Sequence, residues 1–189
     1  MEVVVIVYAR ETVLEYYDAC ISAGFLPISF EVEAGAVARA IVPRSDARSI
    51  MVVDFGKHRL GVGIVHNHVL MYTSTIDIGG GELSQALRGV LGERSEDELT
   101  EIKNTHGLLG THSDQKVTEA LCNTVTDMCT ELSTRVYYWN TRNTATEGRE
   151  LAGIVLCGGS SNLAGLPEFL GKKLSLPTKR AEVWQNAFS

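Results

Sequence analysis

The chain has 189 residues, of which 44% are hydrophobic, and its formal net charge is −6. A chain of this length can bury a substantial core. Its acidic balance, without any cluster of lysine and arginine, argues against nucleic acid as a partner. No apolar run approaches the roughly 20 residues that a membrane-spanning helix needs, and no basic segment followed by an apolar run marks a signal peptide.

The four cysteines predict neither a disulfide framework nor a zinc site. They are widely spaced, contain no CxxC pair and lie within apolar patterns typical of helices and strands. We expect buried thiols in a reducing compartment at Cys20, Cys122, Cys129 and Cys157.

The amino-terminal part of the chain predicts one strand and one helix. Val3–Tyr8 is a continuous apolar run of the kind found in buried strands. A helix is expected from Glu11 to about Ala23.

The next predicted strand, Ile50–Gly56, ends in a loop suited to phosphate. Its four leading apolar residues predict a strand buried on both faces. Asp54 follows them at the mouth of the strand, where a carboxylate can hold a hydrated magnesium ion. Gly56 allows a tight turn beneath a phosphate group. The plainer alternative is that Asp54 only caps the loop after the strand.

Two further strands, Gly61–Val65 and Val69–Thr73, are expected to form a hairpin. His66 and His68 flank its turn, and we interpret them as exposed turn residues because two ligands do not make a closed zinc site. The chain then passes from a strand end at Ile78 into a helix through the glycines Gly79, Gly80 and Gly81. These glycines form either a simple turn or a ligand-binding one.

A second loop of similar design lies about a hundred residues further on. The strand Ile154–Cys157 runs into Gly158, Gly159, Ser160 and Ser161 and then into an amphipathic helix. Paired glycines let backbone N–H groups approach a ligand, and a helix N-terminus adds free donors and partial positive charge. The pattern suits the phosphate and ribose of a nucleotide, although a strand, two glycines and a helix are also a common connector. The segments Gly92–Asp97 and Asn140–Arg149 are polar and predict loops or helix ends.

This order of elements and these loops resemble the actin-like ATPase superfamily, and within it the PilM family of type IV pilus assembly. Val53–Gly56 is similar to the second phosphate loop of the superfamily, and Leu156–Gly165 to its adenosine motif. The remaining segments that carry the resemblance are the connecting helix Glu33–Ala40, the helix end Glu98–Leu108, the helix Glu131–Trp139 and the tail Leu176–Phe188.

The resemblance implies an α/β fold of the actin-like ATPase (ribonuclease H-like) type, with a mixed β-β-β-α-β-α sheet and flanking helices. Residues 1–30 would be a strand and helix of the small inserted subdomain, 31–45 the connecting helix, and 46–189 the second actin-like domain. Superfamily members carry an acidic phosphate loop in each half. The sequence has one strand–Asp–x–Gly loop, so the first half, with its own phosphate loop, is expected to be missing.

The resemblance also implies ATP and Mg²⁺ as cofactors. Asp54 would hold magnesium through water, Lys103 would lie near adenine and ribose, and Glu33 would be the catalytic acid facing the attacking water. Lys103 could instead be a solvated charge, and Glu33 could only begin a helix. The implied nucleotide-binding residues are Asp54, Gly56, Lys57, Gly79, Gly80, Gly81, Lys103, Gly158, Gly159, Ser160 and Ser161.

The chain departs from the family at Lys57, His58 and Arg59, where small or hydroxyl residues are common. Three basic side chains could grip phosphate through charge-assisted bonds. Their bulk could equally fill the space that the phosphate would occupy.

The resemblance implies a cytoplasmic protein held at the inner membrane through a partner in type IV pilus or related secretion assembly. That partner is the amino-terminal tail of an inner-membrane PilN-like protein, bound in a groove partly built by residues 1 to about 30. Other pilus assembly proteins and a second copy of the chain are further expected partners, and ATP turnover is expected to be negligible. The alternatives are a degenerate scaffold without nucleotide, a cell-division actin homologue and a sugar-kinase-like enzyme.

Overall fold

The computed structural model describes residues 5–109, 115–142, 149–184 and 186. Its centre is a five-stranded sheet with the strand order β3-β2-β1-β4-β5. β1, β2 and β3 form an antiparallel meander, whereas β4 and β5 run parallel to β1. The strands are β1 (Ser49–Phe55), β2 (Leu60–His66), β3 (Val69–Ile76), β4 (Leu151–Cys157) and β5 (Thr178–Arg180).

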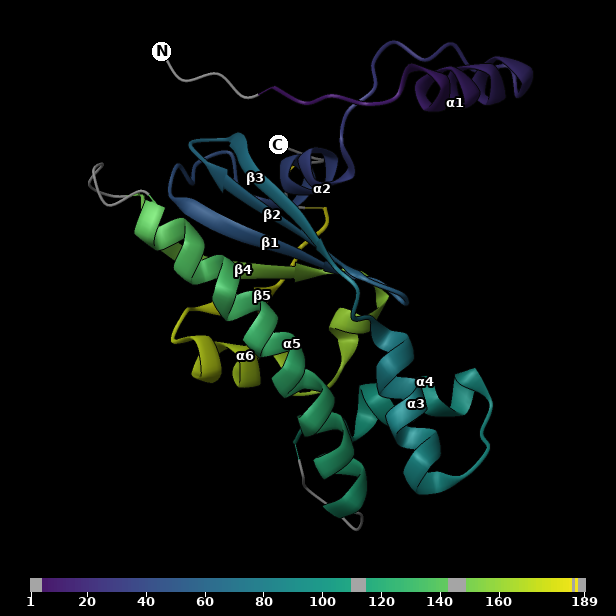
Figure 1. Cartoon of the computed structure of the whole chain (residues 1–189), viewed down its shortest axis with the longest axis vertical. Helices are drawn as coiled ribbons and strands as arrows, with labels where there is room; N and C mark the ends of the chain where they lie inside the picture. Colours follow the sequence, from purple (N-terminus) through teal and green to yellow (C-terminus); the bar gives the residue numbers. More distant parts are fainter. Residues whose placement is uncertain (1–4, 110–114, 143–148, 185, 187–189) are drawn as a thin grey trace.

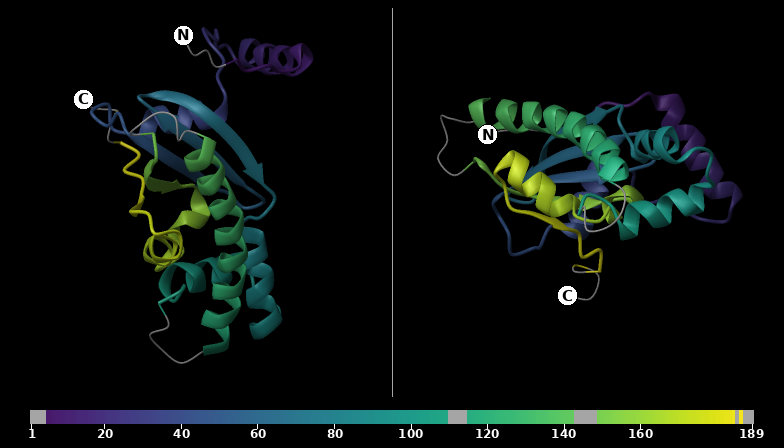
Figure 2. Two further views of the ribbon diagram at one scale, coloured as in Figure 1. Left: turned by 60° about the vertical axis from the view of Figure 1, so that its left-hand side comes forward. Right: turned by 90° about the horizontal axis from the view of Figure 1, so that it is seen from below.

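The central strand β1 packs against helices on both of its faces, as its apolar sequence predicted. Successive side chains of a strand point to opposite faces, so Met51, Val53 and Phe55 enter one cluster of core residues while Ile50 and Val52 enter another. The first cluster lies beneath α3 (Gly80–Leu91), α4 (Glu96–Thr105), α5 (Gln115–Arg142) and α6 (Leu166–Leu174), and the second beneath α2 (Glu33–Ile41). The long α5 runs along the sheet in both views of Figure 2.

The predicted mixed sheet with flanking helices is therefore confirmed, with local differences. β5 was not predicted, because three residues of sequence Thr-Lys-Arg carry no apolar pattern. The predicted loop 92–97 is helical from Glu96 onward, since Ser95 and Glu98 form a capping box. Of the predicted loop 140–149, residues 140–142 belong to α5 and residues 143–148 lie outside the described residues.

Residues 5–32, the amino-terminal arm, project from the body of the molecule (Figure 1). Its helix α1 (Arg10–Ser22) confirms the predicted helix, but it contains no buried residue. The predicted buried strand is wrong over residues 5–8, which form no strand; Val7 is 85% exposed. A strand needs a neighbour for its N–H and C=O groups, and the described part of the chain provides none here. The side chain of Ile28 is also not packed against the rest of the chain, since it is 95% exposed.

The cysteines are buried in differing degrees: Cys129 is fully buried and the other three are half-buried. Burial raises the pKa of Cys129 to about 11 and, together with the charges of Asp54 and Glu33, raises that of Cys157 to about 12. Both thiols therefore stay protonated at neutral pH. Over the described ranges, no helix is both long enough and apolar enough to cross a membrane.

The end of α4 is fixed to the segment that follows β4. The Leu108 N–H donates to the Ala164 carbonyl at 2.8 Å, and the Ala164 N–H donates to the Lys103 carbonyl at 3.0 Å. Gly107 lies between these two bonds with φ +49°, and a Cβ there would stand 2.3 Å from the Ala164 oxygen. Glycine is thus required at this position, and the contact holds Lys103 beside the loop after β4.

Substituting Gly107 with alanine is expected to lower the free energy of unfolding by about 2 kcal/mol, because the left-handed backbone and the close carbonyl both oppose a side chain. Gly89 is the matched control, since it lies in α3 and a Cβ added there would have nothing within 4 Å. Gly89→Ala is expected to raise the same quantity by about 0.5–1 kcal/mol. Urea unfolding measures both, and equal effects of the two substitutions would contradict the role given to Gly107.

Candidate functional site

Three segments that are distant in sequence meet at one edge of the sheet. β1 and β4 are parallel neighbours with Asp54 paired to Cys157, so the loops that follow them leave from the same edge. The loop after β1 spans residues 56–59, and the loop after β4 contains the short 3-10 helix Gly159–Asn162. The third segment is the glycine turn that begins α3, at residues 79–81.

Backbone hydrogen bonds join the glycine turn to the loop after β1. The Gly80 N–H donates to the Gly56 carbonyl at 3.0 Å, and the Gly81 N–H donates to the Lys57 carbonyl at 2.7 Å. The Gly79 N–H donates to Glu82 Oε2 at 2.7 Å. Protein acceptors therefore occupy all three donors, and the turn positions the loop.

The loop after β4 packs against the other two segments so closely that glycine is required at the points of contact. A Cβ at Gly80 would lie 2.1 Å from Ser160 Oγ, and one at Gly158, where φ is +82°, would lie 2.3 Å from Asp54 Oδ1. The Ser160 hydroxyl donates to the Gly56 carbonyl at 3.2 Å. The sequence-predicted residues of the two loops are thus in contact with one another.

A cavity of about 230 Å³ opens where these segments meet the end of α4. Lys57 enters it from the loop after β1 and Lys103 from α4, while Ser84 and Ser160 contribute hydroxyl groups. The remaining lining residues are Gly80, Glu96, Thr100, Asn104, Gly159 and Leu163. Cations and hydroxyl groups around a small cavity suit an anionic ligand that also carries hydroxyl groups.

Lys103 is held in this cavity by Ser84. Its ammonium group donates to Ser84 Oγ at 2.9 Å, and this hydroxyl lies 3.3 Å from Glu96 Oε2. Burial lowers the pKa of Lys103, as do the charges of Lys57 and Arg88, with Glu96 opposing them. Ser84 and Glu96 were not predicted from the sequence. A serine one turn after Gly80 on the apolar face of α3 was the available signal for Ser84.

Asp54 lies at the sheet edge between the two loops and near a second acid. Burial raises its pKa, and the charge of Glu33 raises it further, while Arg59 lowers it. Glu33 is exposed at the start of α2, and its Oε2 lies 4.0 Å from Arg59 Nη2. Arg59 thus supplies positive charge to both carboxylates.

The half-buried carboxylate of Asp54 fits the part of a magnesium ligand acting through water. Mg²⁺ keeps several waters and is held in proteins by one or two carboxylates together with substrate phosphates. No group of three or more His, Cys, Asp or Glu residues that could hold a metal ion occurs in the ranges that the structure describes.

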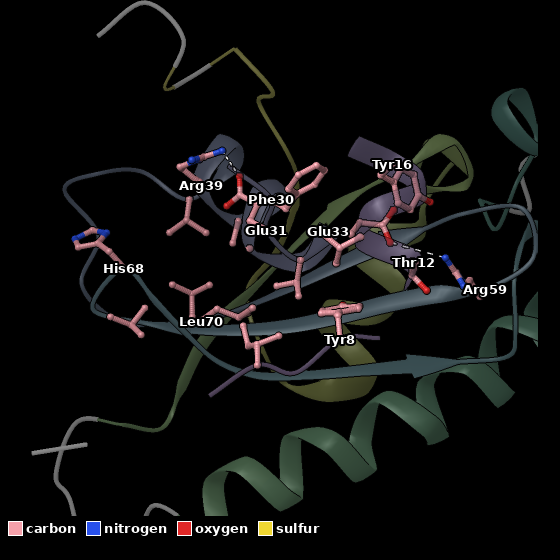
Figure 3. Close-up of a pocket in the computed structure, with 18 of the residues that line it drawn as sticks. Tyr8, Thr12, Tyr16, Phe30, Glu31, Glu33, Arg39, Arg59, His68 and Leu70 are labelled. Carbon is pink, nitrogen blue, oxygen red and sulfur yellow. Dashed lines mark hydrogen bonds and ion pairs between the residues drawn. The ribbon is translucent and has the colours of Figure 1, made fainter. Parts of the chain in front are cut away.

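The basic triplet divides between two sites. Lys57 lines the cavity, whereas Arg59 points toward Glu33 (Figure 3) and lines a different hollow with it. His66, predicted as an exposed turn residue, is half-buried, and its Nδ1 lies 3.0 Å from Ser49 Oγ.

A second, larger hollow lies between the amino-terminal arm, α2 and the edge of the meander (Figure 3). We call it the arm groove; its volume is about 1410 Å³. Tyr8, Tyr16 and Phe30 line it from the arm and Leu70 from β3. Its charged and polar lining residues are Thr12, Glu31, Glu33, Arg39, Arg44, Arg59 and His68. The groove is mainly apolar, with ion pairs joining Arg39 to Glu31 and Arg59 to Glu33.

A meander followed by a crossover to a parallel strand, with loops meeting at the shared sheet edge, is the arrangement of the actin-like fold, and solved structures support this fold. A PilM–PilN type IV pilus biogenesis complex matches with a TM-score of 0.69 and 19% identity, over 94% of this chain and 49% of that chain. MreB 5 of Spiroplasma citri bound to AMPPNP matches with a TM-score of 0.68 and 16% identity, over 94% of this chain and 62% of that chain. Ethanolamine utilization protein EutJ from Carboxydothermus hydrogenoformans matches with a TM-score of 0.65 and 18% identity, over 89% of this chain and 56% of that chain.

The chain belongs to the PilM family: the family model described as Type IV pilus assembly protein PilM matches residues 1–188. No curated protein matches the sequence. The chain spans about half the length of the solved PilM–PilN relative, 49% of it.

Replacing Asp54 with asparagine is expected to raise the melting temperature at pH 7. The folded-state pKa of Asp54 is raised above the ordinary 3.8. At pH values between 3.8 and that raised pKa, the folded chain therefore binds more protons than the unfolded chain. Stability therefore falls as pH rises through that window, and a neutral asparagine avoids the loss.

Thermal unfolding at pH 7 and at pH 4 tests this, with Asp77→Asn, at an exposed carboxylate after β3, as the control. The gain from Asp54→Asn should shrink at the lower pH. A lower melting temperature at pH 7, or a gain that does not change with pH, would contradict the account.

Proposed function

We propose that this chain is a nucleotide-binding, actin-like component of type IV pilus or related secretion assembly. The observation that supports nucleotide binding best is the cavity at which the loop after β1, the loop after β4 and the end of α4 meet, with Lys57 and Lys103 both facing it. Membership of the PilM family supports the role in pilus assembly. One structural relative, MreB 5 of Spiroplasma citri, is bound to AMPPNP.

In this proposal ATP binds with its phosphates towards Lys57 and its ribose and adenine towards Lys103 and Gly159. Gly79, Gly80 and Gly81 act by fixing the loop, because their N–H groups are already bonded. Glu33, exposed at the start of α2 with its Oε2 4.0 Å from Arg59 Nη2, is the proposed catalytic acid. Turnover is expected to be negligible, because the sequence carries one strand–Asp–x–Gly phosphate loop where the superfamily has two, and ATP is a structural or switching ligand.

The proposed partner is the amino-terminal tail of an inner-membrane PilN-like protein, bound in the arm groove. A short tail inserted into a groove buries apolar side chains on both partners, and the aromatic residues Tyr8, Tyr16 and Phe30 offer such a surface. One solved relative is a PilM–PilN complex. This partner would hold the cytoplasmic chain at the inner membrane, beside other pilus assembly proteins. The exposed apolar side chains of the arm also provide a surface for a homodimer.

Titration calorimetry with ATP tests the nucleotide part. Lys103→Gln is expected to weaken ATP binding about tenfold or more, because it removes a half-buried charge-assisted donor. Lys172→Gln, at an exposed lysine of α6, is the control and should leave the affinity unchanged. If ATP fails to bind the unaltered chain while the tail peptide binds, the chain is a scaffold without nucleotide.

Fluorescence anisotropy with a labelled PilN-like amino-terminal peptide tests the partner. Tyr16→Ala and Leu70→Ala, on opposite walls of the arm groove, should each weaken binding about tenfold. Tyr137→Ala is the control, since Tyr137 is 71% exposed on α5 and does not line the groove. Equal losses for all three substitutions would place the peptide elsewhere.

A further inference from the structure

The wall of the cavity that follows β4 is a short helix with little support of its own. Gly159 and Ser160 line the cavity from the 3-10 helix Gly159–Asn162, and Leu163 lines it from the next position. A 3-10 helix has poorer hydrogen-bond geometry than an α-helix, and the last carbonyl groups of a helix have no partner within it. A donor from another segment that binds these carbonyls therefore fixes the position of the wall.

Arg180 of β5 supplies such donors. Its Nε donates to the Ser161 carbonyl at 2.9 Å, and its Nη2 donates to the carbonyls of Leu163 at 3.1 Å and Asn162 at 3.5 Å. A guanidinium presents its N–H groups in a rigid planar fork, so one side chain can bind several neighbouring acceptors. Arg180 thus binds three consecutive carbonyls at the end of the helix, and it does not itself line the cavity.

The backbone of Arg180 is fixed to the strand from which this loop leaves. β5 runs parallel to β4 with Arg180 paired to Leu156, and the Ala181 N–H donates to the Leu156 carbonyl at 2.7 Å. The chain leaves β4 immediately afterwards, at Cys157. Arg180 therefore joins the end of β4 to the 3-10 helix that follows it.

The segment that Arg180 binds also contacts the two other walls of the cavity. The Ser160 hydroxyl donates to the Gly56 carbonyl at 3.2 Å, in the loop after β1. The Ala164 N–H donates to the Lys103 carbonyl at 3.0 Å, at the end of α4. A displacement of the 3-10 helix would therefore change the spacing between the walls.

We propose that Arg180 is a positioning residue of the nucleotide site, which acts from outside the cavity by holding the 3-10 helix against the other two walls. The inference rests on the proposed nucleotide binding and adds a residue that determines its affinity without touching the ligand. When the guanidinium is removed, the three carbonyls bind water instead, and Gly159 and Ser160 lose their fixed place at the cavity.

The experiment is a calorimetric titration of the whole chain with ATP in MgCl₂. Arg180→Ala is expected to weaken binding about tenfold. Arg180→Lys keeps the charge but replaces the planar fork with one ammonium group, so binding should stay at least about threefold weaker than in the unaltered chain. Lys179→Ala is the matched control and should leave the affinity unchanged, because it removes an equal charge from the neighbouring, exposed position of β5.

Hydrogen exchange in the absence of ATP separates positioning from a general loss of stability. Arg180→Ala should speed exchange in residues 158–163, while β1 and α5 keep the exchange rates of the unaltered chain. Faster exchange throughout the chain would show that Arg180 only stabilises the fold, and this would overturn the inference.

Two results of the titration would overturn the inference and leave the proposed nucleotide binding in place. One is an unchanged ATP affinity in Arg180→Ala, and the other is full recovery in Arg180→Lys, which would show that the charge alone matters. If the melting curve shows that Arg180→Ala is unfolded, the affinity of Arg180→Lys decides. If ATP does not bind the unaltered, folded chain, the inference and the proposed nucleotide site are both wrong.

Discussion

Two backbone hydrogen bonds, from Gly80 and Gly81 to the carbonyls of Gly56 and Lys57, hold the site together. They join the start of α3 to the loop after β1, and the two backbones come closest at Gly79, where a Cβ would lie 2.3 Å from the Lys57 carbonyl oxygen. Ser160 completes the contact from the loop after β4. Without this contact the backbone of Lys57 would not be fixed, and the cavity would lose one of its walls.

The same arrangement directs two basic side chains of one loop, Lys57 and Arg59, to different sites. Lys57 lies on the cavity side of the loop with Lys103, and Arg59 lies on the groove side with Glu33. The single short loop between β1 and β2 thus contributes to both the proposed nucleotide site and the arm groove.

The sequence predicted the parts of the fold that follow from local pattern. The apolar run of β1, the hairpin turn at Asn67 and the two glycine loops all have strong periodic or turn signals. The roles of Gly79, Gly80 and Gly81 could not be predicted, because they depend on which backbone acceptors of other segments bind their N–H groups. The failed strand at residues 5–8 has the same cause: its apolar run requires a neighbour that the described residues do not provide. The PilM resemblance, in turn, predicted family and fold together.

We propose that one cavity, built from residues of this chain, receives the nucleotide. Hydrogen-exchange mass spectrometry of the chain with and without ATP tests this proposal. The account predicts slower exchange in three separate segments at once, residues 57–60, 100–104 and 158–163, with the arm unchanged. Protection confined to the arm, or to only one of the three segments, would contradict a shared cavity.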